Sequence, residues 1–146
     1  MTTIVYDHKN KQIACDSRET ADGCIVTDMA EKWLINDTGI WFICGSKSDK
    51  NLFADNFNHN DEAPKNIGCS GLVVIDGVAH KACIDDGVFK LDIMVSNEGV
   101  GSGGWFCQSA VDLGKTAKEA VEYSMTRDIY TGGKVHVYDI EKGKFI

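Results

Sequence analysis

Alternating and β-branched apolar residues predict strands in the first third of the chain. Residues 2–6 are β-branched or aromatic, and a second apolar run follows across a polar turn at 7–10. Two further runs flank the polar, glycine-containing turn at 36–39 and predict a hairpin. The predicted strands of this part cover residues 2–6, 11–16, 24–27, 32–36 and 40–44.

The middle of the chain predicts one short helix followed by three strands. Residues 46–57 show apolar positions on one side of a helix, and the polar segment 58–66, which holds the only proline, Pro64, predicts a loop. Asp-Gly turns at 76–77 and 86–87 separate the apolar runs that come next. These runs predict strands over residues 71–75, 79–84 and 88–91.

The last third predicts two helices and a closing strand. A glycine-rich turn at 99–104 precedes helical patterns over 105–113 and 116–129. Thr116 and Glu119 have the spacing of a capping box at the start of the second helix. Residues 134–140 alternate and predict a final strand.

The order of these elements favours an α+β fold with antiparallel sheets. The helices are segregated from the strands, whereas a parallel α/β sheet would alternate them. The 146 residues suit one domain spanning 1–146, because two domains of half this size would each bury a poor core.

Charge and hydropathy argue against two kinds of binding partner, nucleic acids and membranes. The net charge of −7 and the lack of a Lys/Arg-rich run argue against nucleic-acid binding. No apolar run approaches the roughly 20 residues that span a bilayer. The first residues lack the charged and apolar regions of a signal peptide, so we expect a cytoplasmic protein without membrane association.

The six cysteines predict buried free thiols. Most of them fall in strand-like segments, no CxxC motif occurs, and the four histidines do not cluster with them. A disulfide framework or a zinc site is therefore not expected, and no cofactor is predicted.

Thr2 becomes chemically distinctive once Met1 is removed. A threonine hydroxyl is a weak nucleophile until a base takes its proton. The α-amino group of an N-terminal threonine has a pKa of about 7.7–8.0 and can serve as that base. A small second residue generally permits removal of the initiator methionine. Taken alone, however, Thr2 is more typical of an ordinary residue that opens a strand.

Two charged residues at strand ends change this interpretation. Lys32 opens the fourth predicted strand, and an ammonium beside the nucleophile would lower the pKa of its amine and hydroxyl. Asp16 ends the second strand, and its carboxylate would hold such a lysine charged and oriented. Either residue alone is typical of a solvated surface.

A third group of polar residues follows the last predicted helix. Asp128 and Thr131 are one helical turn apart and can hydrogen-bond an ammonium or hydroxyl at a single point. The simpler interpretation of this segment is a helix C-terminus with a glycine stop.

Together these motifs resemble the proteasome β-subunits and the bacterial HslV peptidase, which are N-terminal-nucleophile (Ntn) hydrolases. Thr2-Thr3-Ile4-Val5 resembles the mature N-terminus of HslV. The other similar motifs, which follow in the family's order, are Ala14-Cys15-Asp16-Ser17-Arg18, Ala30-Glu31-Lys32, Cys44-Gly45-Ser46, Val100-Gly101-Ser102-Gly103 and Arg127-Asp128-Ile129-Tyr130-Thr131-Gly132-Gly133.

The resemblance implies an αββα-type sandwich of two antiparallel sheets and a threonine-type endopeptidase. Thr2 would be the nucleophile, and Lys32, oriented by Asp16, would tune it. The Gly45 amide would stabilise the oxyanion. The residues implied to hold the Thr2 amine in position are Ser102, Asp128 and Thr131.

The chain departs from the family in its helical layer. Only about 25 residues separate Gly45 from the strand at Gly71, where the family has two long helices. We therefore expect a reduced helical layer. The resemblance further implies a peptide or unfolded-protein substrate, a homo-oligomer and an ATP-dependent unfoldase as partner, although the ring geometry is left open by the shortened layer.

Two other functions stay open at this stage. One is a non-catalytic assembly or interaction subunit that retains Met1. The other is a small-molecule Ntn amidohydrolase, because one fold supports several chemistries.

Overall fold

Twelve strands and three helices make up the computed structural model, which describes residues 1–146. Two antiparallel five-stranded sheets have the strand orders β10-β1-β2-β11-β12 and β5-β6-β7-β8-β9, and β3 pairs with β4 in a small third sheet. In chain order the elements are β1 (Thr3–Asp7), β2 (Gln12–Cys15), β3 (Glu19–Ala21), β4 (Cys24–Thr27), β5 (Trp33–Ile35), β6 (Ile40–Cys44), α1 (Lys47–Asn56), β7 (Ser70–Ile75), β8 (Val78–Asp85), β9 (Val88–Ile93), β10 (Glu98–Gly101), α2 (Gly104–Asp112), α3 (Ala117–Met125), β11 (His136–Asp139) and β12 (Lys144–Phe145).

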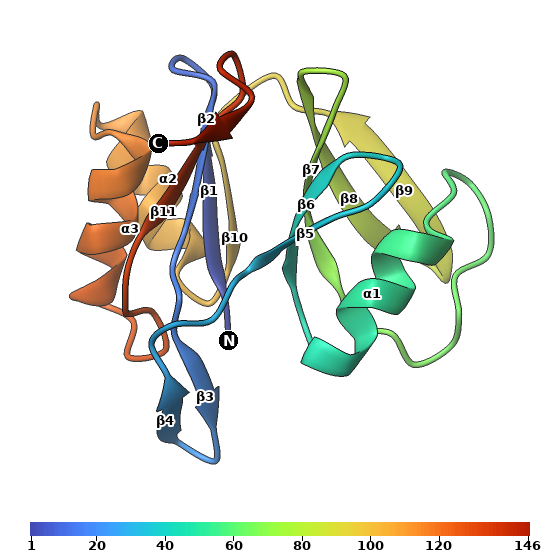
Figure 1. Ribbon diagram of the computed structural model, residues 1–146, viewed down its shortest axis with the longest axis horizontal. Helices are drawn as coiled ribbons and strands as arrows, with labels where there is room; N and C mark the ends of the chain where they lie inside the picture. Colours follow the sequence, from blue (N-terminus) through green and yellow to red (C-terminus); the bar gives the residue numbers. More distant parts are fainter.

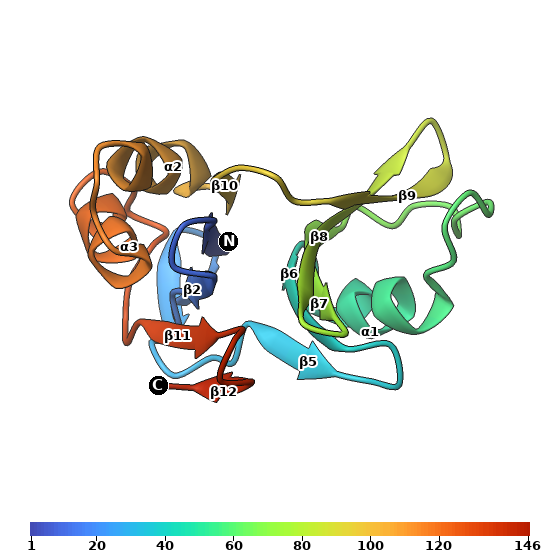
Figure 2. The same cartoon turned by 90° about the horizontal axis from the view of Figure 1, so that it is seen from above.

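The elements stack in four layers. The two large sheets face each other, α2 and α3 cover the outer face of the first sheet, and α1 lies against the outer face of the second (Figures 1 and 2). The predicted α+β class with antiparallel sheets is confirmed. The small β3–β4 sheet is an addition to the two sheets that were predicted. Only α1 lies between β6 and β7, so the second sheet has a single covering helix.

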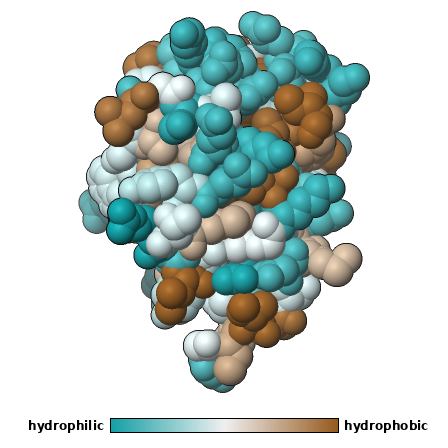
Figure 3. All heavy atoms as spheres, turned by 90° about the vertical axis from the view of Figure 1, so that its left-hand side faces the viewer, coloured by the Kyte–Doolittle hydropathy of each residue, from teal (hydrophilic) through white to brown (hydrophobic).

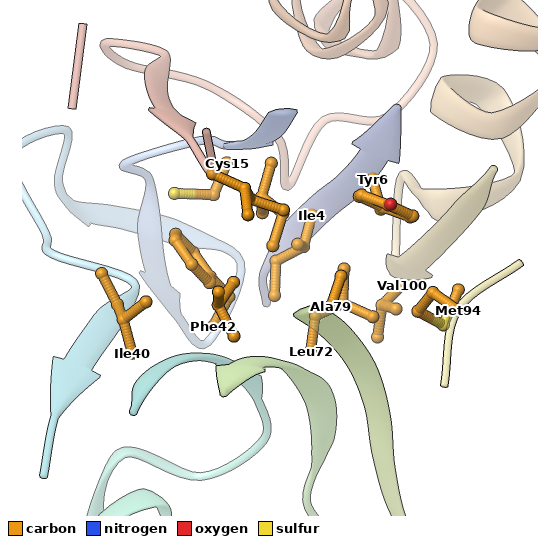
Figure 4. Close-up of a cluster of buried hydrophobic side chains, with 12 residues drawn as sticks. Ile4, Tyr6, Cys15, Ile40, Phe42, Leu72, Ala79, Met94 and Val100 are labelled. Carbon is orange, nitrogen blue, oxygen red and sulfur yellow. The ribbon is translucent and has the colours of Figure 1, made fainter. Parts of the chain in front are cut away.

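The central core lies between the two large sheets. In β1, Ile4 and Tyr6 face the second sheet, and they meet Phe42 and Leu72 there (Figure 4). Val5, between them, points to the other side and packs with α2 and α3. Side chains on neighbouring strand positions point to opposite faces. Both faces of this strand are therefore covered, and all five of its residues are buried.

A separate apolar cluster fixes α1 against the second sheet. Trp41 and Val73 from the sheet contact Phe53 of the helix, and all three side chains are fully buried. The ring centroids of Trp41 and Phe53 lie 6.0 Å apart in an edge-to-face arrangement, which aromatic pairs prefer. This packing holds α1 against the second sheet.

The glycine-rich segment 99–104, predicted as a turn, contributes an edge strand instead. β10 pairs with β1, with Gly101 opposite Thr3. Propensity disfavours glycine in strands, which is why the sequence did not indicate one. The glycines are required by close packing: a Cβ on Gly99 would lie 1.9 Å from the Gly104 carbonyl oxygen.

The second C-terminal helix begins as predicted and ends earlier. Thr116 and Glu119 form both hydrogen bonds of the capping box that the sequence indicates. The helix stops at Met125, four residues before the predicted end. Asp128 redirects the chain, because its carboxylate accepts hydrogen bonds from the Tyr130 amide and the Thr131 hydroxyl.

The outer face that carries α2 and α3 is mixed in character. Hydrophobic residues form separate groups among hydrophilic ones in Figure 3. Trp105, Leu113 and Ile129 are exposed apolar residues of this part of the chain. None of the helices is both long and apolar enough to cross a membrane.

Candidate active site

Thr2 lies directly before β1 and is 4% exposed. Its carbonyl oxygen accepts a hydrogen bond of 3.1 Å from the Ser102 amide and a weaker one of 3.8 Å from the Cys44 thiol. β1 is held between β10 and β2, so the backbone at Thr2 is fixed from both sides. Its hydroxyl therefore has a defined position at the end of the sheet.

Lys32 approaches Thr2 from the segment before β5. Its Nζ donates a hydrogen bond of 3.2 Å to Thr2 Oγ1. The same ammonium donates to the carbonyl oxygens of Met1 at 2.7 Å and Arg18 at 2.6 Å. The lysine side chain is 4% exposed. An ammonium with three acceptors is satisfied in this position, although it is almost removed from water.

Asp16 faces Lys32 from the end of β2. Its Oδ1 lies 3.7 Å from Lys32 Nζ, and the carboxylate is fully buried. Backbone amides of Thr3, Arg18 and Gly132 donate to it at 3.1, 3.4 and 3.2 Å. Burial raises the pKa of Asp16, whereas Lys32 and these amides lower it; the effect of burial prevails, and the pKa lies above its ordinary value.

A second polar network lies around Thr3, on the helix side of β1. Thr3 Oγ1 is 2.7 Å from Thr131 Oγ1 and accepts a hydrogen bond of 3.0 Å from the Gly103 amide. Thr131 in turn donates to Asp128 at 2.6 Å. Thr131 thus bonds to Thr3 and Asp128 to Thr131, and neither forms a hydrogen bond with Thr2.

Hydrogen bonding sets the charge state of Asp128. Burial raises the pKa of this carboxyl, but the nearby hydroxyls of Ser102 and Thr131 and the Tyr130 amide outweigh it. The pKa of Asp128 consequently lies below its ordinary value. The charge of the N-terminal amine also lowers the pKa of Asp128 to a smaller extent.

Ser102 has an unusual position. Its backbone amide is bonded to Thr2, whereas its buried hydroxyl makes no hydrogen bond of normal geometry, although it lies close enough to the Asp128 carboxyl to lower the pKa of that group. Buried polar atoms are normally paired, because leaving one unpaired costs about 1–3 kcal/mol. The hydroxyl can therefore take one more polar neighbour close to Thr2.

A pocket of about 640 Å³ opens beside Thr2. Gly45 is exposed at its wall, and the Gly45 amide donates no hydrogen bond within the protein. Charged residues line much of the remaining wall: Glu19, Glu31, Lys32, Lys47 and Lys50. The chain contains no group of three or more His, Cys, Asp or Glu side chains that could hold a metal ion.

In the structure Lys32 contacts both Thr2 and Asp16, and Gly45 lines the same pocket as Thr2 and Lys32. The sequence-based interpretation missed the bridging role of Thr3. The alternation of side chains along a strand could have indicated this role. Because Thr2 and Thr3 are neighbours, their side chains point to opposite faces, and Thr131 can contact only one of them. It also missed Lys50, which no motif marks.

Comparisons with known proteins indicate what this fold resembles. The sequence matches no protein-family profile. A search of curated proteins likewise finds no match. Thiobacillus denitrificans BPH is similar in structure, with a TM-score of 0.70 and 16% identity over 94% of this chain and 95% of that one. The same protein in complex with epoxomicin gives a TM-score of 0.67 and 16% identity over 94% and 97% of the two chains. At this identity the likeness concerns the fold, and this chain has a fold similar to that of Thiobacillus denitrificans BPH.

Proposed function

We propose that this protein is a proteasome-like threonine hydrolase that cleaves peptide bonds with Thr2 after Met1 has been removed. The contact that carries the proposal is the 3.2 Å hydrogen bond from Lys32 Nζ to Thr2 Oγ1. A buried lysine held by a buried carboxylate, beside a hydroxyl at the wall of an open pocket, is a costly arrangement for structure alone. It suits a nucleophile whose pKa must be lowered.

The reaction follows from these positions. Removal of Met1 frees the Thr2 amine, which takes the proton of its own hydroxyl while Oγ1 attacks the substrate carbonyl carbon. The Gly45 amide stabilises the oxyanion that forms. The C–N bond then breaks, the proton passes to the leaving amine, and an ester on Thr2 remains. Water hydrolyses this ester, releases the acid and restores the hydroxyl.

The position of the Ser102 hydroxyl fits this proposal. With Met1 attached, the Thr2 nitrogen is part of an amide, and the buried Ser102 hydroxyl makes no hydrogen bond of normal geometry, although it lies near the Asp128 carboxylate. A free Thr2 amine would offer this hydroxyl a partner, and the Asp128 carboxylate would stabilise the ammonium that forms when the amine takes the hydroxyl proton. The fold similarity to BPH, which has been solved in complex with the proteasome inhibitor epoxomicin, is in accord with the proposal.

The test is intact mass spectrometry before and after treatment with an epoxyketone probe. We expect the purified protein to lack the mass of one methionine and to gain one probe per chain on Thr2. The variant Thr2→Ala should gain none. Thr38→Ala, in an exposed turn, should label like the parent protein.

Two results would contradict the proposal. Homogeneous protein that keeps Met1 and stays unlabelled would favour a non-catalytic subunit of the same fold. Thr2-dependent turnover of small amides without turnover of peptides would instead identify a small-molecule amidohydrolase.

A further inference from the structure

The pocket beside Thr2 holds one lysine that lacks a carboxylate partner. Two of its three lysines already have carboxylate partners: Lys32 faces Asp16 at 3.7 Å, and Lys47 faces Glu19 at 3.8 Å. Lys50, in the first turns of α1, has no salt bridge and no hydrogen bond to any protein group. It is the one pocket lysine whose ammonium is free to meet a ligand.

The surroundings of Lys50 disfavour its charge when the pocket is empty. The residue is half-buried. Burial and the ammonium of Lys32 lower the pKa of Lys50, while Cys44, Cys69 and Glu19 raise it to a smaller extent. An ammonium that is partly removed from water and lies near another cation gains most from an added anion.

The remaining acidic group of the pocket does not neutralise Lys50. Glu31 is exposed, and its charge acts on His136 rather than on Lys50. Moreover, Gly45, Ser46 and Lys47 at the start of α1 line the same pocket, so the positive end of this helix faces it. An anionic side chain entering from the Thr2 side meets both positive features together.

We propose that Lys50 determines specificity by binding the carboxylate of the substrate residue whose carbonyl Thr2 attacks. The enzyme then cleaves preferentially after glutamate or aspartate. This inference rests on the proposed function, because the pocket selects a side chain only if Thr2 is the attacking group. The pocket volume of about 640 Å³ accommodates either acidic side chain.

The experiment compares matched peptide amides with a fluorogenic leaving group that differ only in the residue before the cleaved bond. Glutamate and glutamine form the decisive pair, since they differ in charge and hardly in shape. A charge-assisted hydrogen bond is worth about 1.5–3 kcal/mol, which corresponds to a Glu/Gln ratio in kcat/KM of ~10–100. Substrates ending in leucine and arginine complete the panel.

Variants at Lys50 and at a lysine outside the pocket provide the comparison. Lys50→Met should bring the Glu/Gln ratio close to one, and Lys50→Glu should shift the preference toward arginine. Lys118→Met should leave the ratio unchanged, because Lys118 is exposed on α3 and does not line the pocket. In the parent protein the ratio should fall as salt is raised, since ions screen a partly exposed pair.

Labelling of Thr2 by an uncharged epoxyketone is measured in every variant. It distinguishes a failure of the proposed role of Lys50 from a failure of the proposed function. If the parent protein labels but its Glu/Gln ratio is near one, the role of Lys50 is overturned and the proposed function stands. A ratio that survives in labelled Lys50→Met overturns it as well. If the parent protein neither labels nor hydrolyses any peptide, the proposed function fails and the specificity with it. Should Lys50→Met not fold, the parent ratio and its salt dependence still decide.

Discussion

Lys32 Nζ lies 3.2 Å from Thr2 Oγ1, although Thr2 precedes β1 of the first large sheet and Lys32 precedes β5 of the second. The same ammonium is 3.7 Å from the buried carboxylate of Asp16. The hydroxyl and the ammonium thus line the pocket, and the carboxylate lies buried behind the ammonium. This order suits a hydroxyl whose proton has to be given up easily.

The first prediction concerns the charge of Lys32. Lys32→Met should abolish epoxyketone labelling of Thr2, and it should lower the free energy of unfolding by about 3–5 kcal/mol because Asp16 is left as an unpaired buried charge. Urea unfolding and intact mass spectrometry measure the two effects. The double variant Asp16→Asn/Lys32→Met should recover part of the stability and none of the labelling. A double variant less stable than Lys32→Met would contradict this account of the pair.

The second prediction concerns acid stability. The folded pKa of Asp128 lies below its ordinary value of 3.8, so its carboxylate stabilises the fold above that pH, and the contribution is lost as the pH falls through the lower folded pKa. Asp128→Asn should therefore be less stable than the parent protein by about 1–2 kcal/mol at neutral pH. The difference should shrink toward zero as the pH falls through the folded pKa of Asp128.

Urea unfolding across this pH range checks the Asp128 prediction. Asp37→Asn, in an exposed turn, is the control and should have the stability of the parent protein at neutral pH. A deficit in Asp128→Asn that stays constant down to acid pH would show that the charge of Asp128 is not what stabilises the turn.

The third prediction concerns the close approach of Gly101 to Thr2. Gly101 has φ +91°, and a Cβ there would lie 1.7 Å from the Thr2 carbonyl oxygen. Gly101→Ala should displace the start of β1 and abolish labelling of Thr2. Gly77 has φ +77°, and a Cβ on it would have no other atom within 4 Å, so Gly77→Ala should cost only about 1–2 kcal/mol of backbone strain. Equal labelling of the two variants would contradict the prediction.

The fourth prediction concerns the six thiols. All are free in the structure, and Cys24 is exposed whereas Cys15 and Cys107 are buried. Burial raises the pKa of Cys107 to about 12, and that of Cys44 also to about 12, so neither forms the reactive thiolate near neutral pH. Iodoacetamide should modify Cys24 first in the native protein and all six cysteines after unfolding. Mass spectrometry without a reductant that shows fewer than six modified residues would reveal a disulfide.

Three elements show which features of the fold can be predicted from local sequence patterns and which cannot. The capping box at Thr116 was predictable because its two hydrogen bonds join residues three positions apart. β10 was not predictable, since its glycines carry no strand propensity and it exists because β1 offers a free edge. The end of α3 was missed because the Asp128 side chain competes with the helix for backbone amides.

The sequence by itself determined the α+β class, the antiparallel strands around their polar turns, and a set of residue types suited to N-terminal-nucleophile chemistry. Only the tertiary structure decided which of these residues meet. It placed Lys32 against Thr2, directed Thr131 to Thr3, and left Lys50 unpaired in the pocket. The physical reason is the sequence separation over which each effect acts. Propensity, alternation and capping depend on a few neighbouring residues, whereas the order of strands in a sheet and the side chains that meet across it depend on the packing of segments distant in the chain.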